Sequence, residues 1–250
     1  MPDFLASLLG IEGIGWLILA GLAAGLVRGF TGFGSGLVFL PVAAQLLPPF
    51  GAILTMTVMD LFGPAPILRR AWAAVEKGDL GRLVLGCALV LPLGMWVLTR
   101  IAPEIFRIGV ALLALAMLAV LSLGLRYRGR ISRGMVGGIG GLAGLLGGMA
   151  GLPGPPVILF YMSRPLPVAT IRATILLFLL AYDLLLMGYM AAMGRFMAEF
   201  LWLGLALSVP NMLGNWLGAR LFRPEWEAAY RVAAYVLIAT SALSALPVWR

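Results

Sequence analysis

A glycine-rich stretch near the start of the chain carries the residue types that bind small anions. It reads Arg28-Gly-Phe-Thr-Gly-Phe-Gly-Ser-Gly36 and places one cation and two hydroxyls among four glycines. Glycine permits positive φ and a close approach of backbone to ligand, so neighbouring N–H groups can converge on an anion. Arginine adds a planar fork that suits sulfite, sulfonate or carboxylate oxygens. We therefore predict an anion-binding site formed by Arg28, Thr31, Gly32, Gly34, Ser35 and Gly36.

A second stretch of this kind, Gly147-Gly-Met-Ala-Gly-Leu-Pro-Gly-Pro-Pro156, has no charge. Its prolines favour the first positions of a helix, where no N–H partner is needed, and a helix N-terminus attracts anions. We expect Gly151, Pro153 and Gly154 to complete the site. Two alternatives stay open: the glycines only permit close helix packing, and Arg28 either reaches the membrane interface or pairs with a carboxylate.

Two carboxylates interrupt apolar stretches, Asp60 in Leu54-Thr-Met-Thr-Val-Met-Asp-Leu-Phe and Asp183 in Leu179-Leu-Ala-Tyr-Asp-Leu-Leu-Leu. An ionisable residue inside a membrane is costly and is a functional candidate by default. We predict that Asp60 and Asp183 carry a coupling proton, because desolvation favours the protonated carboxyl group. The alternative is a structural ion pair with Arg28 or with an arginine of a loop.

Asn211 and Asn215 follow Pro210 and are four residues apart, so they share one face of a helix beside a kink. They are candidates either for hydrogen bonds to a substrate or for hydrogen bonds between helices.

The composition of the chain indicates that the segments carrying these residues lie in a membrane. Of the 250 residues, 62% are hydrophobic and 11% are charged, whereas a soluble domain has about 25% charged residues. The predicted fold class is an all-α polytopic membrane protein. This length allows on the order of ten spans of about 20 residues each.

Several classes of chemistry are excluded by residue types. The chain has no histidine and a single cysteine, Cys87, so we expect no metal site, no cofactor, no catalytic residues and no enzymatic activity. The net charge of +8 lies in short tethers between apolar stretches. That pattern favours control of topology and contact with anionic lipid headgroups over nucleic-acid binding.

An internal repeat organises the chain. The segment Gly25–Gly36 recurs as Gly144–Pro155 at an offset of 119 residues. Pro92 recurs as Pro210, and Arg100-Ile-Ala-Pro-Glu104 recurs as Arg220-Leu-Phe-Arg-Pro-Glu225. We predict a first transmembrane repeat over 12–125, a basic cytoplasmic linker over 126–133 and a second repeat over 134–248.

Each repeat divides into five apolar segments, and the first two of each meet at a glycine-rich break. A continuous helix is disfavoured there because glycine costs about 1 kcal/mol and proline about 3 kcal/mol in a helix interior. We predict broken helices or hairpins that re-enter the membrane. The expected segments are 14–27, 33–48, 52–68, 82–99 and 105–124, followed by 134–149, 154–163, 168–192, 198–218 and 227–247.

The distribution of Lys and Arg favours repeats of opposite orientation. If the repeats are inverted, 13 basic residues lie on one side and 4 on the other, with Arg28 set aside at the break. If the first pair of each repeat makes one crossing instead, the repeats are parallel and the count is 10 against 7. Because cytoplasmic loops carry the excess of Lys and Arg, we predict inverted repeats and place both termini in the periplasm.

At the breaks, RGFTGFGSGLVFLPV and GGLAGLLGGMAGLPGPPVILF, and at the Pro-Glu element that opens the last segment of each repeat, the sequence resembles the TauE/SafE sulfite exporter family. The resemblance spans about residues 12 to 247. It implies transport of sulfite, sulfoacetate or another organosulfonate across the bacterial inner membrane. The second break departs from the glycine pattern at Pro153, Pro155 and Pro156.

We therefore expect a secondary transporter that moves a small oxyanion by alternating access between two inverted repeats. Its partners would be the anionic substrate and the lipid bilayer, without nucleic acid, and a homodimer is one candidate assembly. The alternatives are a passive anion channel, a transporter of a small carboxylate, and a membrane scaffold or sensor without transport.

Overall fold

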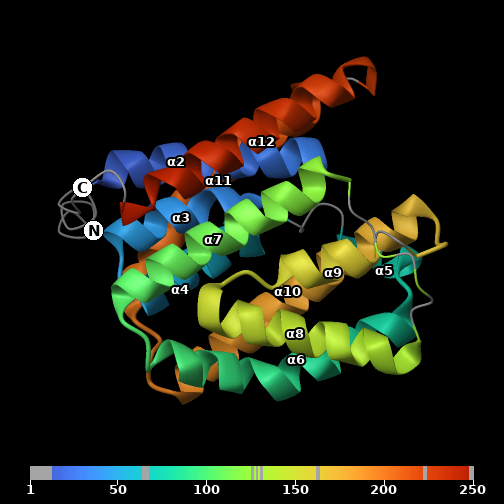
Figure 1. Ribbon diagram of the computed structural model, residues 1–250, viewed down its shortest axis with the longest axis horizontal. Helices are drawn as coiled ribbons and strands as arrows, with labels where there is room; N and C mark the ends of the chain where they lie inside the picture. The colour runs from blue at the N-terminus through green and yellow to red at the C-terminus, as the bar shows by residue number, and fades with distance from the viewer. Residues whose placement is uncertain are drawn as a thin grey trace. The chain divides into compact units, whose positions relative to one another are not determined.

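The computed structural model of the chain is helical throughout the residues that it describes, namely 13–63, 68–124, 127, 129, 132–161, 164–221 and 224–247. These contain eleven α-helices and one short 3₁₀ helix (Figure 1). The elements are α2 (Ile14–Thr31), α3 (Ser35–Leu46), α4 (Pro49–Leu61), α5 (Leu68–Ala74), α6 (Lys77–Leu98), α7 (Pro103–Ser122), α8 (Arg133–Ala150), α9 (Gly154–Tyr161), α10 (Val168–Ala192), α11 (Ala198–Leu221), η2 (Pro224–Trp226) and α12 (Glu227–Ser244).

The helices form two compact units. The first comprises Met1–Phe62, Pro103–Leu118 and Met197–Arg250, and the second comprises Gly63–Ala102 and Ala119–Phe196. The first unit therefore combines α2, α3, α4 and most of α7 with α11 and α12, and the second combines α8, α9 and α10 with α5 and α6.

In the first unit, α2 and α11 run parallel in close backbone contact. Gly25 lies against the backbone of Asn211, and one turn further along both helices Gly29 lies against the backbone of Asn215. A Cβ atom at Gly25 would overlap the carbonyl oxygen of Asn211. Small residues at such contacts let membrane helices approach closely, which gains van der Waals contact where lipid provides no hydrophobic driving force.

Helix α4 lies parallel to α11 on another face. The Thr55 hydroxyl donates to the carbonyl of Phe200 at 3.4 Å, and further along Val58 contacts the position of Gly204. Because α2 and α4 both run parallel to α11, the last residues of α2 and α4 lie at the same end of this unit.

The second unit repeats this arrangement with other helices. Gly144 of α8 lies against Cys87 of α6, and Gly148 lies against Leu91, so α6 and α8 are parallel. A Cβ atom at Gly144 would stand 2.6 Å from the carbonyl oxygen of Cys87. The face of α6 that carries Cys87 and Leu91 is therefore fully buried.

Helix α10 is also parallel to α6. The hydroxyl of Thr174 accepts a hydrogen bond from the backbone N–H of Glu76 at 3.4 Å, and the hydroxyl of Tyr189 donates to the carbonyl of Ala88 at 3.0 Å. The first residues of α6, α8 and α10 consequently share one end of the second unit.

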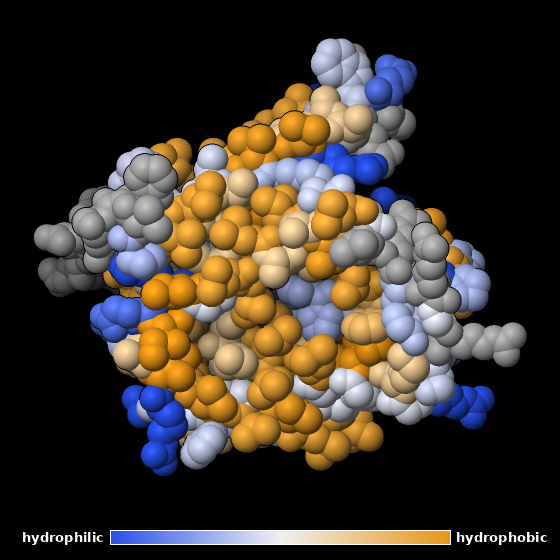
Figure 2. Space-filling model, viewed as in Figure 1, coloured by the Kyte–Doolittle hydropathy of each residue, from blue (hydrophilic) through white to orange (hydrophobic). Residues whose placement is uncertain are grey.

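Large hydrophobic side chains face outward along the helices, as expected for contact with lipid. On α6 the exposed fractions are 62% for Leu85, 72% for Leu89 and 53% for Trp96. The face shown in Figure 2 is covered mainly by hydrophobic residues. Within the described residues, α2, α6, α7 and α10 are long and apolar enough to cross a membrane. The protein is thus an all-helical, multi-pass membrane protein.

Each of the ten apolar segments expected from the sequence overlaps a helix, although α4 ends at Leu61 instead of residue 68 and α6 begins at Lys77 instead of residue 82; the additional elements are the short α5 and η2. Of the counted basic residues, Arg126, Arg128, Arg130, Arg223 and Arg250 lie outside the described residues, as does half of the predicted linker. The repeat boundaries, the inversion of the repeats and the re-entry of their first segments stay predictions.

Candidate functional site

The first break is a three-residue turn between α2 and α3. Helix α2 ends at Thr31, and its C-cap Gly32 has φ of 82°. Gly34, the N-cap of α3, has φ of 92°, so two of the three turn residues adopt a conformation that favours glycine. The Thr31 hydroxyl donates to the carbonyls of Val27 at 2.9 Å and Phe33 at 2.6 Å. Thr31 thus caps the end of α2.

Arg28, Ser35 and Asp60 meet beside this break. The Arg28 Nη1 lies 3.0 Å from Oδ1 of Asp60, and both side chains are about nine-tenths buried. The Ser35 hydroxyl donates to Oδ2 of Asp60 at 2.5 Å. Asp60 stands next to the end of α4, while Ser35 opens α3. The sequence predicted Arg28 and Ser35 as anion ligands and Asp60 as a proton carrier, and the structure brings all three together.

The guanidinium of Arg28 keeps most of its donors unused in the described part of the chain. Only Nη1 is engaged, with the Asp60 carboxylate and with the Asp60 backbone carbonyl at 3.5 Å. Oδ1 of Asp60 receives no well-directed hydrogen bond from the described residues, so its contact with Arg28 is an ion pair of imperfect alignment. Arg28 can therefore offer its Nε and Nη2 donors to an oxyanion while one nitrogen remains on Asp60.

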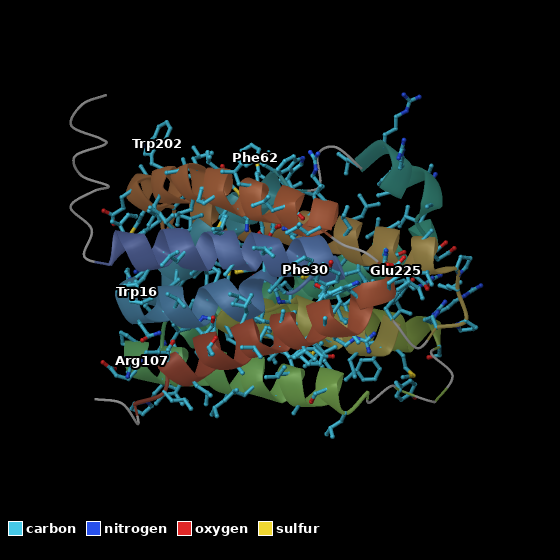
Figure 3. The ribbon with its side chains drawn as sticks, turned by 90° about the horizontal axis from the view of Figure 1, so that it is seen from above. Trp16, Phe30, Phe62, Arg107, Trp202 and Glu225 are labelled. Atoms are coloured by element: carbon cyan, nitrogen blue, oxygen red, sulfur yellow. The ribbon has the colours of Figure 1, made fainter. Side chains whose placement is uncertain are left out.

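The C-terminal end of α2 also carries Phe30, whose ring stacks on Tyr230 of α12 with centroids 4.8 Å apart. Figure 3 shows Phe30 at this end of α2 and Trp16 near its beginning. This stacking anchors α12 against the helix that presents Arg28.

Asn211 and Asn215 line the contact between α11 and α2. Asn211 is 1% exposed, and its Nδ2 donates to the carbonyl of Gly21 at 3.4 Å. Its Oδ1 has no hydrogen-bond partner among the described residues. Asn215 is half-buried and presents its backbone to Gly25 and Gly29. Asn211 therefore holds α11 to α2 and keeps one acceptor unused.

The second break is built differently. Helix α8 ends at Ala150, its C-cap Gly151 has φ of 68°, and α9 begins at Gly154. Gly151, Pro153 and Gly154 are buried. The ring of Tyr182 fills the space beside Gly147, and its hydroxyl donates to the Gly147 carbonyl at 2.9 Å. The residues of the break itself, Gly151, Leu152 and Pro153, carry no charge.

Asp183 lies in the second unit, on α10, and is half-buried. Asp60 lies in the first unit. The two carboxylates therefore occupy separate compact units, and an assignment of both as proton carriers stays a prediction.

A further carboxylate, Asp79, was missed by sequence reasoning. It is 4% exposed and binds Arg82, Arg164 and Tyr161. The apolar pattern places the start of the fourth segment at residue 82, whereas α6 begins at Lys77, so Asp79 was assigned to a loop. The signal that could have found it is the Asp79–Arg82 spacing of three residues, which is typical of an ion pair on a helix.

Comparison with known families decides what kind of protein carries this arrangement. The family model described as "Sulfite exporter TauE/SafE" matches residues 17–245, which is nearly the whole chain. The chain belongs to the TauE/SafE family. The resemblance found in the sequence is thereby confirmed, and this TauE/SafE protein is a membrane transporter of a family of sulfite exporters. Searches of curated proteins and of solved structures gave no match.

Proposed function

We propose that this TauE/SafE protein transports a small sulfur-containing oxyanion, such as sulfite or an organosulfonate, and that Arg28 binds it. The observation that carries the proposal is the Arg28 guanidinium, which is nine-tenths buried beside the first break and contacts the described residues through Nη1 alone. A buried arginine with unused donors favours a planar or tetrahedral oxyanion. Ser35 and the turn Gly32–Gly34 lie next to it.

Alternating access between inverted repeats is the mechanism we infer. In this topology the chain reverses direction at every connection between successive membrane segments. Helices α2, α4 and α11 are then parallel to one another, and α6, α8 and α10 are also parallel to one another. Those are the directions that the contacts within each unit support. If α2 and α3 together made one crossing, α4 would run opposite to α11. The excess of basic residues on one side supports the same topology, with both termini in the periplasm of the inner membrane.

Proton coupling at Asp60 completes the proposal. An anion bound to Arg28 and the negatively charged Asp60 would contact the same guanidinium group and repel each other. Binding of the anion is therefore favoured when Asp60 takes up a proton. Among the elements around Asp60, α2 contributes Arg28 and α3 contributes no charge. Helix α11 carries Glu199 and Arg220 at its two ends. Asp183 remains the second candidate, in the other unit.

Flux of radiolabelled sulfite into proteoliposomes, measured without oxygen, tests the proposal. With the membrane potential clamped at zero, we expect saturable uptake that increases when unlabelled sulfite is present on the opposite side, which a passive channel does not show under that condition. Arg28→Gln should lower the flux about 100-fold, and Arg28→Lys should retain part of it because the charge remains while the fork is lost. Asp60→Asn should remove the response to a pH gradient, and Asp183→Asn tests the other candidate.

The matched control is Arg133→Gln, which removes an exposed arginine at the start of α8. Its flux should equal that of the wild type. Full flux in a folded Arg28→Gln variant would remove Arg28 from the site, and stronger uptake of acetate than of sulfite would replace the substrate class by small carboxylates. A full pH response in both aspartate variants would exclude coupling through either residue.

A further inference from the structure

At the end of the second unit where α6 begins and α9 ends, Asp79 lies at the centre of a charged cluster. Its Oδ1 is 3.0 Å from Nη1 of Arg82. Its Oδ2 is 2.8 Å from Nη2 of Arg164 and accepts a hydrogen bond from the hydroxyl of Tyr161 at 2.9 Å. Tyr161 is fully buried and Asp79 is 4% exposed. Three elements thus position this cluster: α6, the end of α9 and the residues that follow α9.

The cluster contains two guanidinium groups for one carboxylate and therefore has a surplus positive charge. Both oxygens of Asp79 are occupied, so Asp79 has little capacity to satisfy further donors. Each arginine uses one nitrogen on Asp79, and neither guanidinium group makes another ion pair or hydrogen bond with the described residues. Arg164 additionally lies over the ring of Tyr161, with 5.6 Å between its Cζ atom and the ring centroid. The unused N–H donors of Arg82 and Arg164 allow the two arginines to bind an anion together.

The surrounding charges reinforce this surplus. Exposed cations on α5, α6, α8 and α10 belong to the same end of the unit: Arg69, Arg70, Lys77, Arg133 and Arg172. Glu76 is exposed and lies with Arg82 near the position of Gly78. The ion pair that Arg82 makes among the described residues is with Asp79 and not with Glu76. An excess of one sign of charge around a partly exposed site raises the local concentration of the opposite ion.

We propose that Arg82 and Arg164 form a second oxyanion site in the second unit, distinct from Arg28, with Asp79 as the residue that positions them. The Arg82 side chain is 36% exposed and that of Arg164 is 20% exposed, so an anion can reach them from solution. The ligand class, a small sulfur oxyanion, rests on the proposed function. Asp79 holds the two forks together when the site is empty, and Tyr161 fixes the carboxylate. An arriving anion bridges the unused nitrogens of both arginines.

The test is equilibrium dialysis of the full-length protein in detergent against radiolabelled sulfite, without oxygen. We expect two bound anions per wild-type chain, one in Arg28→Gln and none when Arg82→Gln and Arg164→Gln are added. Asp79→Asn in the Arg28→Gln background keeps a side chain of the same shape with a hydrogen-bond acceptor between the arginines, but removes the negative charge that opposes an anion. It should therefore tighten the remaining site about tenfold, whereas a purely structural ion pair predicts no gain in affinity.

Arg133→Gln in the Arg28→Gln background is the matched control, because it removes one exposed charge from the same end without touching the cluster. Its affinity should change less than about twofold. One anion per wild-type chain and none in Arg28→Gln would overturn the second site and leave the proposed function intact. Two anions in Arg28→Gln would instead refute the role of Arg28. If the variant without both arginines does not fold, an unchanged or weaker affinity with Asp79→Asn overturns the proposal.

Discussion

Beside the first break an ion pair fills the space next to α2, and beside the second break an aromatic ring fills the corresponding space next to α8. Arg28 and Gly147 are 119 residues apart, the offset that also relates Gly25 to Gly144. Arg28 reaches Asp60, whereas the absent side chain of Gly147 leaves room for Tyr182. The same helix contacts thus surround a charged pair in one unit and a neutral tyrosine in the other.

The polar groups of the two units also lie at opposite ends of their helices. In the first unit the carboxylate Asp60 stands near the end of α4, beside the break. In the second unit the buried carboxylate Asp79 stands in the first turn of α6, at the end where α9 finishes. The helix contacts match α4 of the first unit to α10 of the second, and α11 of the first unit to α6 of the second. Asp60 then corresponds to Leu179, and Asp79 corresponds to Leu203. Neither leucine carries a charge. The two units therefore share an arrangement of helices but carry their buried charged residues at different positions.

The shared framework gives the largest expected effect. Gly25→Leu and Gly144→Leu place a side chain against backbone of the partner helix, which cannot rotate away. We expect a cost that exceeds the total stability of the protein, which is typically about 5–15 kcal/mol, and therefore no folded protein in either case. Size-exclusion chromatography of the detergent-solubilised variants measures this.

Gly15→Leu on α2 and Gly138→Leu on α8 are the matched controls. Both glycines are exposed, and a Cβ atom at either position would meet no atom within 4 Å. We expect folded protein from both. A monodisperse, folded Gly144→Leu variant would contradict the close packing of α8 on α6.

The helices could be predicted from the sequence because apolar length and glycine-rich breaks are local properties. The anion-binding hypothesis likewise named Arg28, Ser35 and Asp60 from their types alone. The pairing of α2 with α11 and of α6 with α8 could not be read in this way, because it joins segments of different repeats. In the sequence, Pro92 of α6 aligns with Pro210 of α11 at an offset of 118 residues. The glycine contacts instead match α6 to α11 at an offset of 124 residues. Asp79 was missed because charged residues in the first turn of a helix are indistinguishable from loop residues by hydropathy.

The charged pair of the first unit gives the next largest effect. Asp60→Asn leaves Arg28 as an uncompensated buried charge, and breaking a buried pair in this way costs about 3–5 kcal/mol. The double variant with Arg28→Gln removes both charges and should recover most of that loss. Thermal unfolding in detergent compares the stability of Asp60→Asn, of Arg28→Gln and of the double variant. A single variant as stable as the wild type would mean that Asp60 does not neutralise Arg28.

Tyr182 offers the corresponding experiment in the second unit. Gly147→Ala inserts a methyl group into the volume of the Tyr182 ring, and overpacking of this kind costs about 1–3 kcal/mol. In a Tyr182→Leu background the added methyl has space, so the same change should cost much less. A double-mutant cycle based on thermal unfolding gives the coupling energy. Additive effects of the two changes would show that the ring does not occupy this space in the folded protein.

Thr31 gives the smallest expected effect and separates a structural role from binding. The corresponding position at the end of α8 is Ala150, which has no hydroxyl, and α8 nevertheless ends there with its C-cap Gly151 at a positive φ of 68°. In the first unit the hydroxyl of Thr31 is engaged with two backbone carbonyls and accepts from the N–H of Phe33 at 3.2 Å. Thr31→Ala should therefore cost about 0.5–1.5 kcal/mol of stability, the net value of an intramolecular hydrogen bond. Sulfite flux in proteoliposomes should stay within about twofold of the wild type, because the lost hydrogen bonds are made to backbone rather than to the anion. A large loss of flux in a variant of unchanged thermal stability would instead make Thr31 an anion ligand, as the sequence alone suggested.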